Sequence, residues 1–136
     1  MQIGNATSHF GGSSGDWSSV NIYGADYYPV VGRGTPISGT RIYMFGAASG
    51  ETTGRIDKTN VSVSVDAPYA TLTGMCSGTY SCGSGDSGAG IFSQSISDLV
   101  NSSNGVTYGI QSSGLFYSGT NEWAGESFFT PISKVY

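Results

Sequence analysis

Short stretches in which apolar and polar residues alternate recur along the chain. The clearest is Val61–Val65, whose Val-Ser-Val-Ser-Val pattern has the period of two expected of a strand with one buried face. Similar stretches, rich in β-branched and aromatic residues, are Trp17–Tyr23, Thr40–Phe45, Thr53–Asp57, Tyr69–Met75, Gly90–Ser93, Gly105–Ser112 and Glu126–Pro131. Helical periodicity is weak, except over Ser95–Asn101 and the last few residues. The pattern therefore predicts an all-β protein.

Glycine, proline and asparagine separate these stretches at short intervals. The breaks fall at Gly32–Gly34, Gly46–Gly50, Asp66–Pro68 and Asn101–Gly105. Many short strands with glycine at the corners are typical of a closed antiparallel barrel.

Composition narrows the classes of function. Only 10% of the 136 residues are charged, and with a net charge of −4 the few cations form no basic stripe for nucleic acid. No apolar run approaches the length of a membrane span. Low charge with abundant Ser, Thr and Gly favours a secreted protein whose leader is absent from this sequence. Neither a cofactor nor a metal is expected, because two cysteines and one histidine cannot complete a tetrahedral zinc site without a carboxylate.

Cys76 and Cys82 are the two cysteines, six positions apart among Gly and Ser. This spacing allows a disulfide that would close a small loop. Two free buried thiols are the alternative.

The run Gly85-Asp86-Ser87-Gly88 follows Cys82 closely. Glycines on both sides let the backbone turn sharply, so that the amides of Gly85 and Ser87 can point at one spot. A serine hydroxyl attacks a carbonyl well when a base takes its proton and such amides hold the oxyanion that forms. The alternative is a Gly/Ser-rich surface turn.

Several ordered segments resemble the streptogrisin and α-lytic protease branch of the chymotrypsin-type serine proteases. They are Arg33-Gly-Thr, Gly50-Glu-Thr-Thr-Gly54, the Ser87 run, Tyr108-Gly-Ile-Gln-Ser-Ser-Gly114 and Phe128-Phe-Thr-Pro-Ile132. The resemblance implies a Greek-key β-barrel fold. It places a remnant of the first barrel in residues 1–30 and the complete second barrel, with nucleophile and specificity pocket, in residues 31–136.

The resemblance also implies a catalytic triad in the order His, Asp, Ser. Asp16, before an alternating strand, matches the acid, and His9 is the one histidine. The family inserts several strands between these two residues, whereas seven positions separate them here. The expectation is therefore that the catalytic histidine lies upstream of Met1, with His9 as the alternative. The chain would then be a fragment that binds a complementary N-terminal segment or a second copy of itself.

Other roles follow from the same resemblance. Asp86 needs a cation if buried, and Arg33 matches the arginine that pairs with it in the bacterial branch. Gln111, Ser112, Ser113 and Gly114 line the substrate path, with Ser113 and Gly114 offering backbone groups to an extended peptide. Gly114 indicates an open pocket entrance, and the expected side chain before the cut is apolar and of medium or large size.

The leading interpretation is a secreted serine endopeptidase that forms an acyl-enzyme on Ser87 and acts on peptides or proteins. The alternative is a catalytically inactive binding or structural module that kept the fold. A β-sandwich that binds carbohydrate through Trp17 and Trp123 is a third reading, but it leaves the ordered glycine motifs unexplained.

Overall fold

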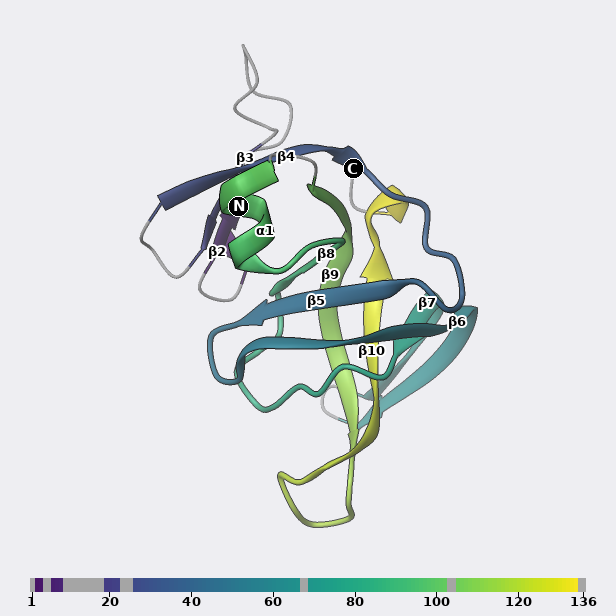
Figure 1. The fold of residues 1–136 in the computed structure, drawn as a ribbon. Helices are drawn as coiled ribbons and strands as arrows, with labels where there is room; N and C mark the ends of the chain where they lie inside the picture. Colours follow the sequence, from purple (N-terminus) through teal and green to yellow (C-terminus); the bar gives the residue numbers. More distant parts are fainter. Residues whose placement is uncertain are drawn as a thin grey trace.

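A computed structural model describes residues 2–3, 6–8, 19–22, 26–66, 69–102 and 105–134, with side chains over 32–64, 71–99 and 105–134. The strands are β1 (Gln2–Ile3), β2 (Ala6–Ser8), β3 (Ser19–Ile22), β4 (Asp26–Arg33), β5 (Arg41–Gly46), β6 (Gly50–Asp66), β7 (Tyr69–Gly78), β8 (Gly90–Phe92), β9 (Gly105–Phe116) and β10 (Trp123–Pro131). Two short helices, α1 (Ile96–Ser102) and the 3₁₀ helix η2 (Ile132–Lys134), complete the elements of the described residues (Figure 1).

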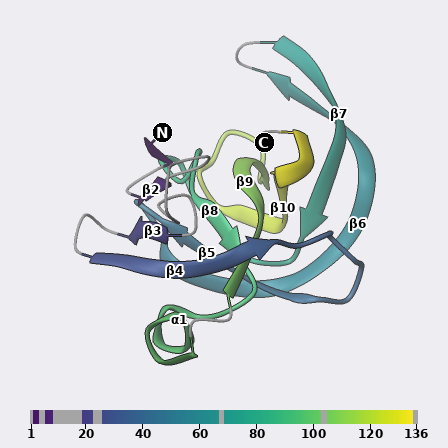
Figure 2. The same ribbon diagram turned by 90° about the horizontal axis from the view of Figure 1, so that it is seen from above.

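Six of the strands form an antiparallel barrel. The order of pairing is β9-β10-β7-β6-β5-β8, and β8 pairs again with β9. Closure depends on the three residues of β8, which pair with Ile110, Gly109 and Thr107 of β9, so the barrel is closed over a short part of its length. Figure 2 shows β6 and β7 as long curved strands around one side. The all-β barrel expected from the sequence is confirmed.

The N-terminal strands extend this sheet. β1, β2, β3 and β4 pair in sequence as antiparallel neighbours. β4 then runs parallel to β9, with Val30 opposite Gly105 and Arg33 opposite Thr107. The sequence pattern missed β4, since Pro29 and Asp26 are residues that strands disfavour. It also placed a break at Gly32–Gly34, whereas the strand continues through Arg33.

β6 corrects a second expectation. The sequence predicted two strands, Thr53–Asp57 and Val61–Val65, but pairing with β7 continues from Ile56 to Asp66. Register shifts between Ile56 and Val63 interrupt the ladder, and Asn60 there has a left-handed φ of 55°. Bulges of this kind bend a strand without ending it, so Lys58 and Asn60, which the sequence pattern left between two strands, belong to one continuous strand.

Two apolar clusters stabilise the barrel. The larger fills the interior with Ile42, Met44, Ile56, Cys76, Tyr80, Cys82, Ala89, Ile91 and Phe129. The smaller joins Phe45, Phe92 and Leu99, so that α1 covers β5 and β8 from outside. The rings of Phe45 and Phe92 stack with centroids 5.3 Å apart. Successive side chains of a strand point to opposite faces, so burial alternates along the first part of β9 and every second side chain there lies in the interior.

No helix among the described residues is long and apolar enough to cross a membrane. In the same part of the chain, no group of three or more His, Cys, Asp or Glu residues gathers as a metal site would require.

Candidate functional site: the Ser87 loop and its groove

The loop between β7 and β8 carries Ser87. Gly85 and Gly88 have φ values of 98° and 88°, a region of backbone conformation that favours glycine. The Asp86 amide donates to the Gly83 carbonyl at 3.1 Å, and the Ala89 amide donates to the Asp86 carbonyl at 3.0 Å. The glycines of the motif are therefore required by the fold of the loop.

Two backbone hydrogen bonds attach this loop to β9. The Gly88 amide donates to the carbonyl of Gln111 at 2.8 Å, and the Gln111 amide donates to the carbonyl of Ala89 at 2.8 Å. The Ser87 turn is thus fixed against the segment that follows Gln111. Sequence reasoning expected both on one substrate path, and the structure brings them together.

Asp86 is fully buried under this loop. Its Oδ1 accepts hydrogen bonds from the amides of Ala48 at 2.8 Å and Ser49 at 3.0 Å, and its Oδ2 accepts one from the Gly83 amide at 2.8 Å. Burial alone raises the pKa of this carboxyl, but hydrogen bonds from the Ser49 side chain and from these amides outweigh burial. The pKa of Asp86 consequently lies below its ordinary value.

The hairpin turn between β5 and β6 supplies the first two of those amides. Gly46 begins this turn, and a Cβ atom placed on it would lie 2.1 Å from Asp86 Oδ1. The Asp86 carboxylate therefore occupies the space that any other residue at position 46 would need. Sequence analysis identified 46–50 as a turn but missed its role, since backbone amides leave no side-chain signature.

The structure does not bring Arg33 and Asp86 together, which corrects the expected ion pair. Arg33 is exposed at the end of β4 and borders a smaller cavity with Pro36 and Ile132. The Asp86 carboxylate is neutralised by oriented amide dipoles instead of by a guanidinium group.

Ser87 itself is exposed. Its hydroxyl donates a hydrogen bond to the backbone carbonyl of Ser112 at 3.1 Å. The amides of Gly85 and Ser87 make no hydrogen bond within the described residues, while those of Asp86, Gly88 and Ala89 do. In this loop the amides of Asp86, Gly88 and Ala89 stabilise its conformation, and the amides of Gly85 and Ser87 remain available to donate a hydrogen bond to a ligand.

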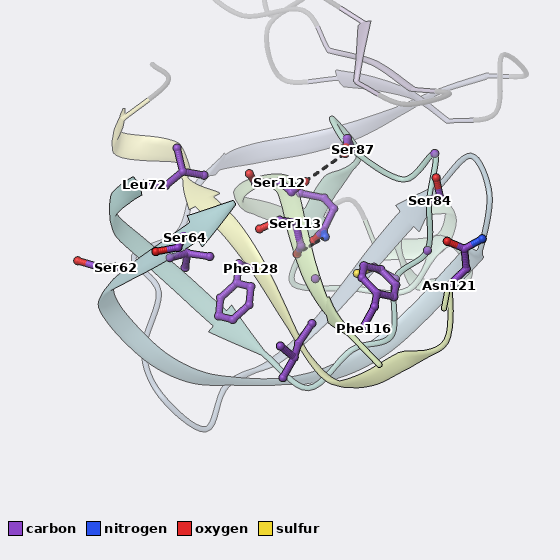
Figure 3. Close-up of a pocket in the computed structure, with 17 residues that line it drawn as sticks. Ser62, Ser64, Leu72, Ser84, Ser87, Ser112, Ser113, Phe116, Asn121 and Phe128 are labelled. Atoms are coloured by element: carbon purple, nitrogen blue, oxygen red, sulfur yellow. Dashed lines mark hydrogen bonds between the residues drawn. The ribbon is translucent and has the colours of Figure 1, made fainter. Parts of the chain in front are cut away.

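A groove of about 800 Å³ opens beside Ser87 (Figure 3). One wall is β9 and the other is the outer part of the β6–β7 hairpin, where Val63 and Leu72 are opposite each other in the strand pairing. The lining residues that the structure describes are all uncharged: Ser62, Val63, Ser64, Leu72, Cys82, Gly83, Ser84, Gly85, Ser87, Gln111, Ser112, Ser113, Gly114, Leu115, Phe116, Asn121 and Phe128. All four predicted substrate-path residues are among them.

Gln111 and Ser113 differ in how their polar atoms are satisfied. The Gln111 side chain is buried, accepts a hydrogen bond from the Tyr80 hydroxyl and donates one to the Ser113 carbonyl at 2.9 Å. The Ser113 hydroxyl is buried and has no hydrogen-bond partner within the described part of the chain. Gln111 is therefore held rigidly, whereas Ser113 carries a spare polar group at the groove.

Cys76 and Cys82 are free, buried thiols, so the expected disulfide is wrong. Cys76 lies in β7, paired with Phe129 of β10. Cys82 lies in the loop after β7, with the Ser127 hydroxyl 3.1 Å from its sulfur. Burial raises the pKa of both thiols. The two side chains serve as small apolar groups of the core cluster.

The predicted triad members His9 and Asp16 lie outside the described residues. Their roles therefore stay predictions.

Comparison with known proteins gives likeness of fold. The sequence matches no protein-family model, and no curated protein matches it. Among solved structures, a chymotrypsin of Cellulomonas bogoriensis is similar, with TM-score 0.65 and 24% identity over 87% of this chain and 56% of that one. Protease A of Thermobifida fusca has TM-score 0.63 and 25% identity over 87% and 55%. A Nocardiopsis protease has TM-score 0.62 and 20% identity over 96% and 55%.

The chain thus spans little more than half the length of these proteases. The similarity covers most of this chain. The described chain has the fold of the bacterial chymotrypsin-type serine proteases.

Proposed function

We propose that this chain carries the nucleophile and substrate groove of a secreted serine endopeptidase. The observation that carries the proposal is the position of Ser87 on a loop fixed by buried Asp86. Ser87 is exposed there at the edge of a large groove whose described lining residues are uncharged. The fold shared with bacterial serine proteases supports it.

Ser87 Oγ attacks the carbonyl of the scissile peptide bond while a general base takes its proton. The C–N bond then breaks, the amine leaves with that proton, and an acyl-enzyme remains on Ser87. The negative charge that develops on the carbonyl oxygen is stabilised by the amides of Gly85 and Ser87. These amides have no other partner in the described chain, so both are available to donate. Water then hydrolyses the acyl-enzyme and restores the Ser87 hydroxyl.

The substrate backbone lies along β9 at Ser112–Gly114. These residues line the groove and follow the last pairing between β8 and β9, at Ile110. An extended peptide adds to such a strand edge through main-chain hydrogen bonds, while the groove accommodates its side chains.

A general base must take the proton of Ser87, which in this structure is donated to the Ser112 carbonyl. Our proposal assigns Asp16 as the acid that orients the base. The base is either His9 or a histidine from a complementary segment or a second copy of the chain. Residues 1–30 would accordingly belong to a first barrel and residues 31–136 to the second.

The alternative is a binding module that has the fold without catalysis. The hydrogen bond from Ser87 to Ser112 favours it, because the described residues offer Ser87 no basic side chain. In that case the groove still binds an extended peptide, and Ser87 serves as a polar contact.

Labelling with a fluorophosphonate separates the two functions. We expect a stoichiometric adduct that peptide mapping locates on Ser87 and that Ser87→Ala abolishes. Ser118→Ala is the matched control, since Ser118 is an exposed serine that does not line the groove, and its loss should leave labelling intact. His9→Ala reports whether His9 is the base. A folded chain that takes no label would favour the binding module.

A further inference from the structure

Gly114 of β9 lies directly against two other residues of the groove. A Cβ atom placed on Gly114 would be 2.5 Å from Cys82 Sγ and 3.2 Å from Cε2 of the Phe116 ring. Carbon atoms in favourable contact are about 3.5–4.0 Å apart. The space above Gly114 is therefore filled by the chain itself, and this end of the groove is narrower than the glycine suggested.

Cys82 is held in this place by its surroundings. Its side chain is 5% exposed and belongs to the core cluster of the barrel. The Ser127 hydroxyl lies 3.1 Å from the Cys82 sulfur, donates to the Tyr80 carbonyl at 2.6 Å and accepts from the Trp123 indole at 3.0 Å. A thiol fixed from behind in this way cannot move aside for a bulky ligand without disturbing these contacts.

Phe116 completes the obstruction from the other side. It is partly buried, packs against the same core cluster and lines the groove beside Gly114 (Figure 3). Unlike Cys82, it lies near the end of β9, where the β9–β10 hairpin leaves the barrel (Figure 1). Replacing Phe116 by alanine should consequently open this end of the groove with less disturbance of the barrel than a change at Cys82.

Charge limits the ligand further. None of the described residues that line the groove is charged, so among them a charged side chain placed beside Gly114 would lose water without gaining a partner.

We propose that Cys82 and Phe116 are the specificity-determining residues of this groove and restrict it to peptides with a small uncharged side chain, such as alanine, beside Gly114. The inference rests on the proposed function in that it assumes a peptide extended along Ser112–Gly114. It replaces the expectation of a medium or large apolar side chain. Larger apolar groups fit the part of the groove that Leu72 of β7 and Phe128 of β10 line.

Binding to the unreactive Ser87→Ala chain tests this apart from catalysis. Acetylated tetrapeptide amides, identical except for alanine or phenylalanine at one position, are titrated while backbone amide resonances are followed by NMR. We expect the alanine peptide to bind about 10-fold or more tightly than the phenylalanine peptide, with shifts at Ser112–Gly114.

Phe116→Ala in the same background should reduce or reverse that preference, because the vacated space accepts the phenyl ring. Cys82→Ala is the milder second variant if Phe116→Ala does not fold. Tyr117→Ala is the matched control, since Tyr117 is an exposed aromatic residue of the same hairpin that does not line the groove. It should leave the ratio of the two affinities unchanged.

Equal binding of the two peptides would overturn the inference, as would a ratio that neither Phe116→Ala nor Cys82→Ala changes. Absence of binding by either peptide would overturn it as well. Fluorophosphonate labelling of Ser87 distinguishes these failures from failure of the proposed function. A labelled Ser87 without alanine preference contradicts the specificity alone, and alanine preference without labelling contradicts the catalysis alone.

Discussion

The buried carboxylate of Asp86 accepts a hydrogen bond from the backbone amide of Ser49 at 3.0 Å. This contact joins the loop that carries Ser87 to the β5–β6 turn, 37 positions earlier in the sequence. A carboxylate that accepts several amide hydrogen bonds is stabilised in its charged form without a cation. The Ser87 loop is therefore held in shape by the barrel's own backbone.

Replacement of Gly46 by alanine should disturb this arrangement. The added methyl group would meet Asp86 Oδ1 at 2.1 Å, and we expect a loss of about 2–3 kcal/mol in the free energy of unfolding. Denaturant titration measures it. Gly32→Ala is the control, because no atom lies within 4 Å of a Cβ placed there. A Gly46→Ala chain as stable as the unmodified one would show that Asp86 is not packed against this turn.

Replacement of Asp86 by asparagine should change the dependence of stability on pH. The pKa of Asp86 is lowered in the folded chain, so its charged form contributes stability above the ordinary aspartate pKa of about 3.9. That contribution is lost as the pH falls through the lower, folded pKa. Asp86→Asn should therefore lower the free energy of unfolding by about 2 kcal/mol at pH 7. The loss should be smaller in strong acid, where the carboxyl of the unmodified chain is protonated as well.

Thermal unfolding of Asp86→Asn between pH 7 and pH 2 measures this difference. Glu122→Gln, at an exposed position, is the control for removing a carboxylate. An effect of Asp86→Asn that is equal at both ends of the range would contradict the lowered pKa.

Tyr80→Phe should weaken the support of the groove. Tyr80 is fully buried, and its hydroxyl donates to the Gln111 side chain, which would be left with an unpaired oxygen. The expected cost is about 1–3 kcal/mol in the free energy of unfolding. Since burial raises the pKa of Tyr80 well above 10, this donor persists into alkaline solution. Tyr117→Phe is the control. Tyr117 is exposed, so loss of its hydroxyl should change the free energy of unfolding very little.

Thiol titration checks the state of the cysteines. With Cys76 and Cys82 both free and buried, a disulfide-exchange reagent should react slowly with the folded chain and rapidly with two thiols after unfolding without reductant. The raised pKa of both thiols slows the native reaction further. If the unfolded, unreduced chain has no reactive thiol, then Cys76 and Cys82 form a disulfide and the two thiols are not free.

Local pattern predicted much of the fold but less of the site. The strand at Val61–Val65 and the turn around Ser87 depend mainly on local sequence, namely alternating apolar residues and glycines with positive φ. Both can therefore be predicted without knowing the rest of the fold. The hydrogen-bond donors to Asp86 include backbone amides that the folding of the barrel brings near. Every residue except proline has such an amide, so the sequence does not show which ones will lie there. The prediction chose Arg33 because a charged side chain is visible in the sequence. Similarly, Gly114 looked like an open entrance because the sequence does not show that Cys82 lies against it.

The most direct test of Ser87 as the nucleophile is an NMR titration of the unmodified chain with an acetyl-Ala-Ala-Ala boronic acid, which forms a tetrahedral adduct with an active serine. We expect a tetrahedral boron signal together with large shifts of the Gly85 and Ser87 amides, both absent in Ser87→Ala. A folded chain whose boron stays trigonal, or whose Gly85 and Ser87 amides do not respond to the adduct, would contradict the assignment of Ser87 as nucleophile in an amide oxyanion hole.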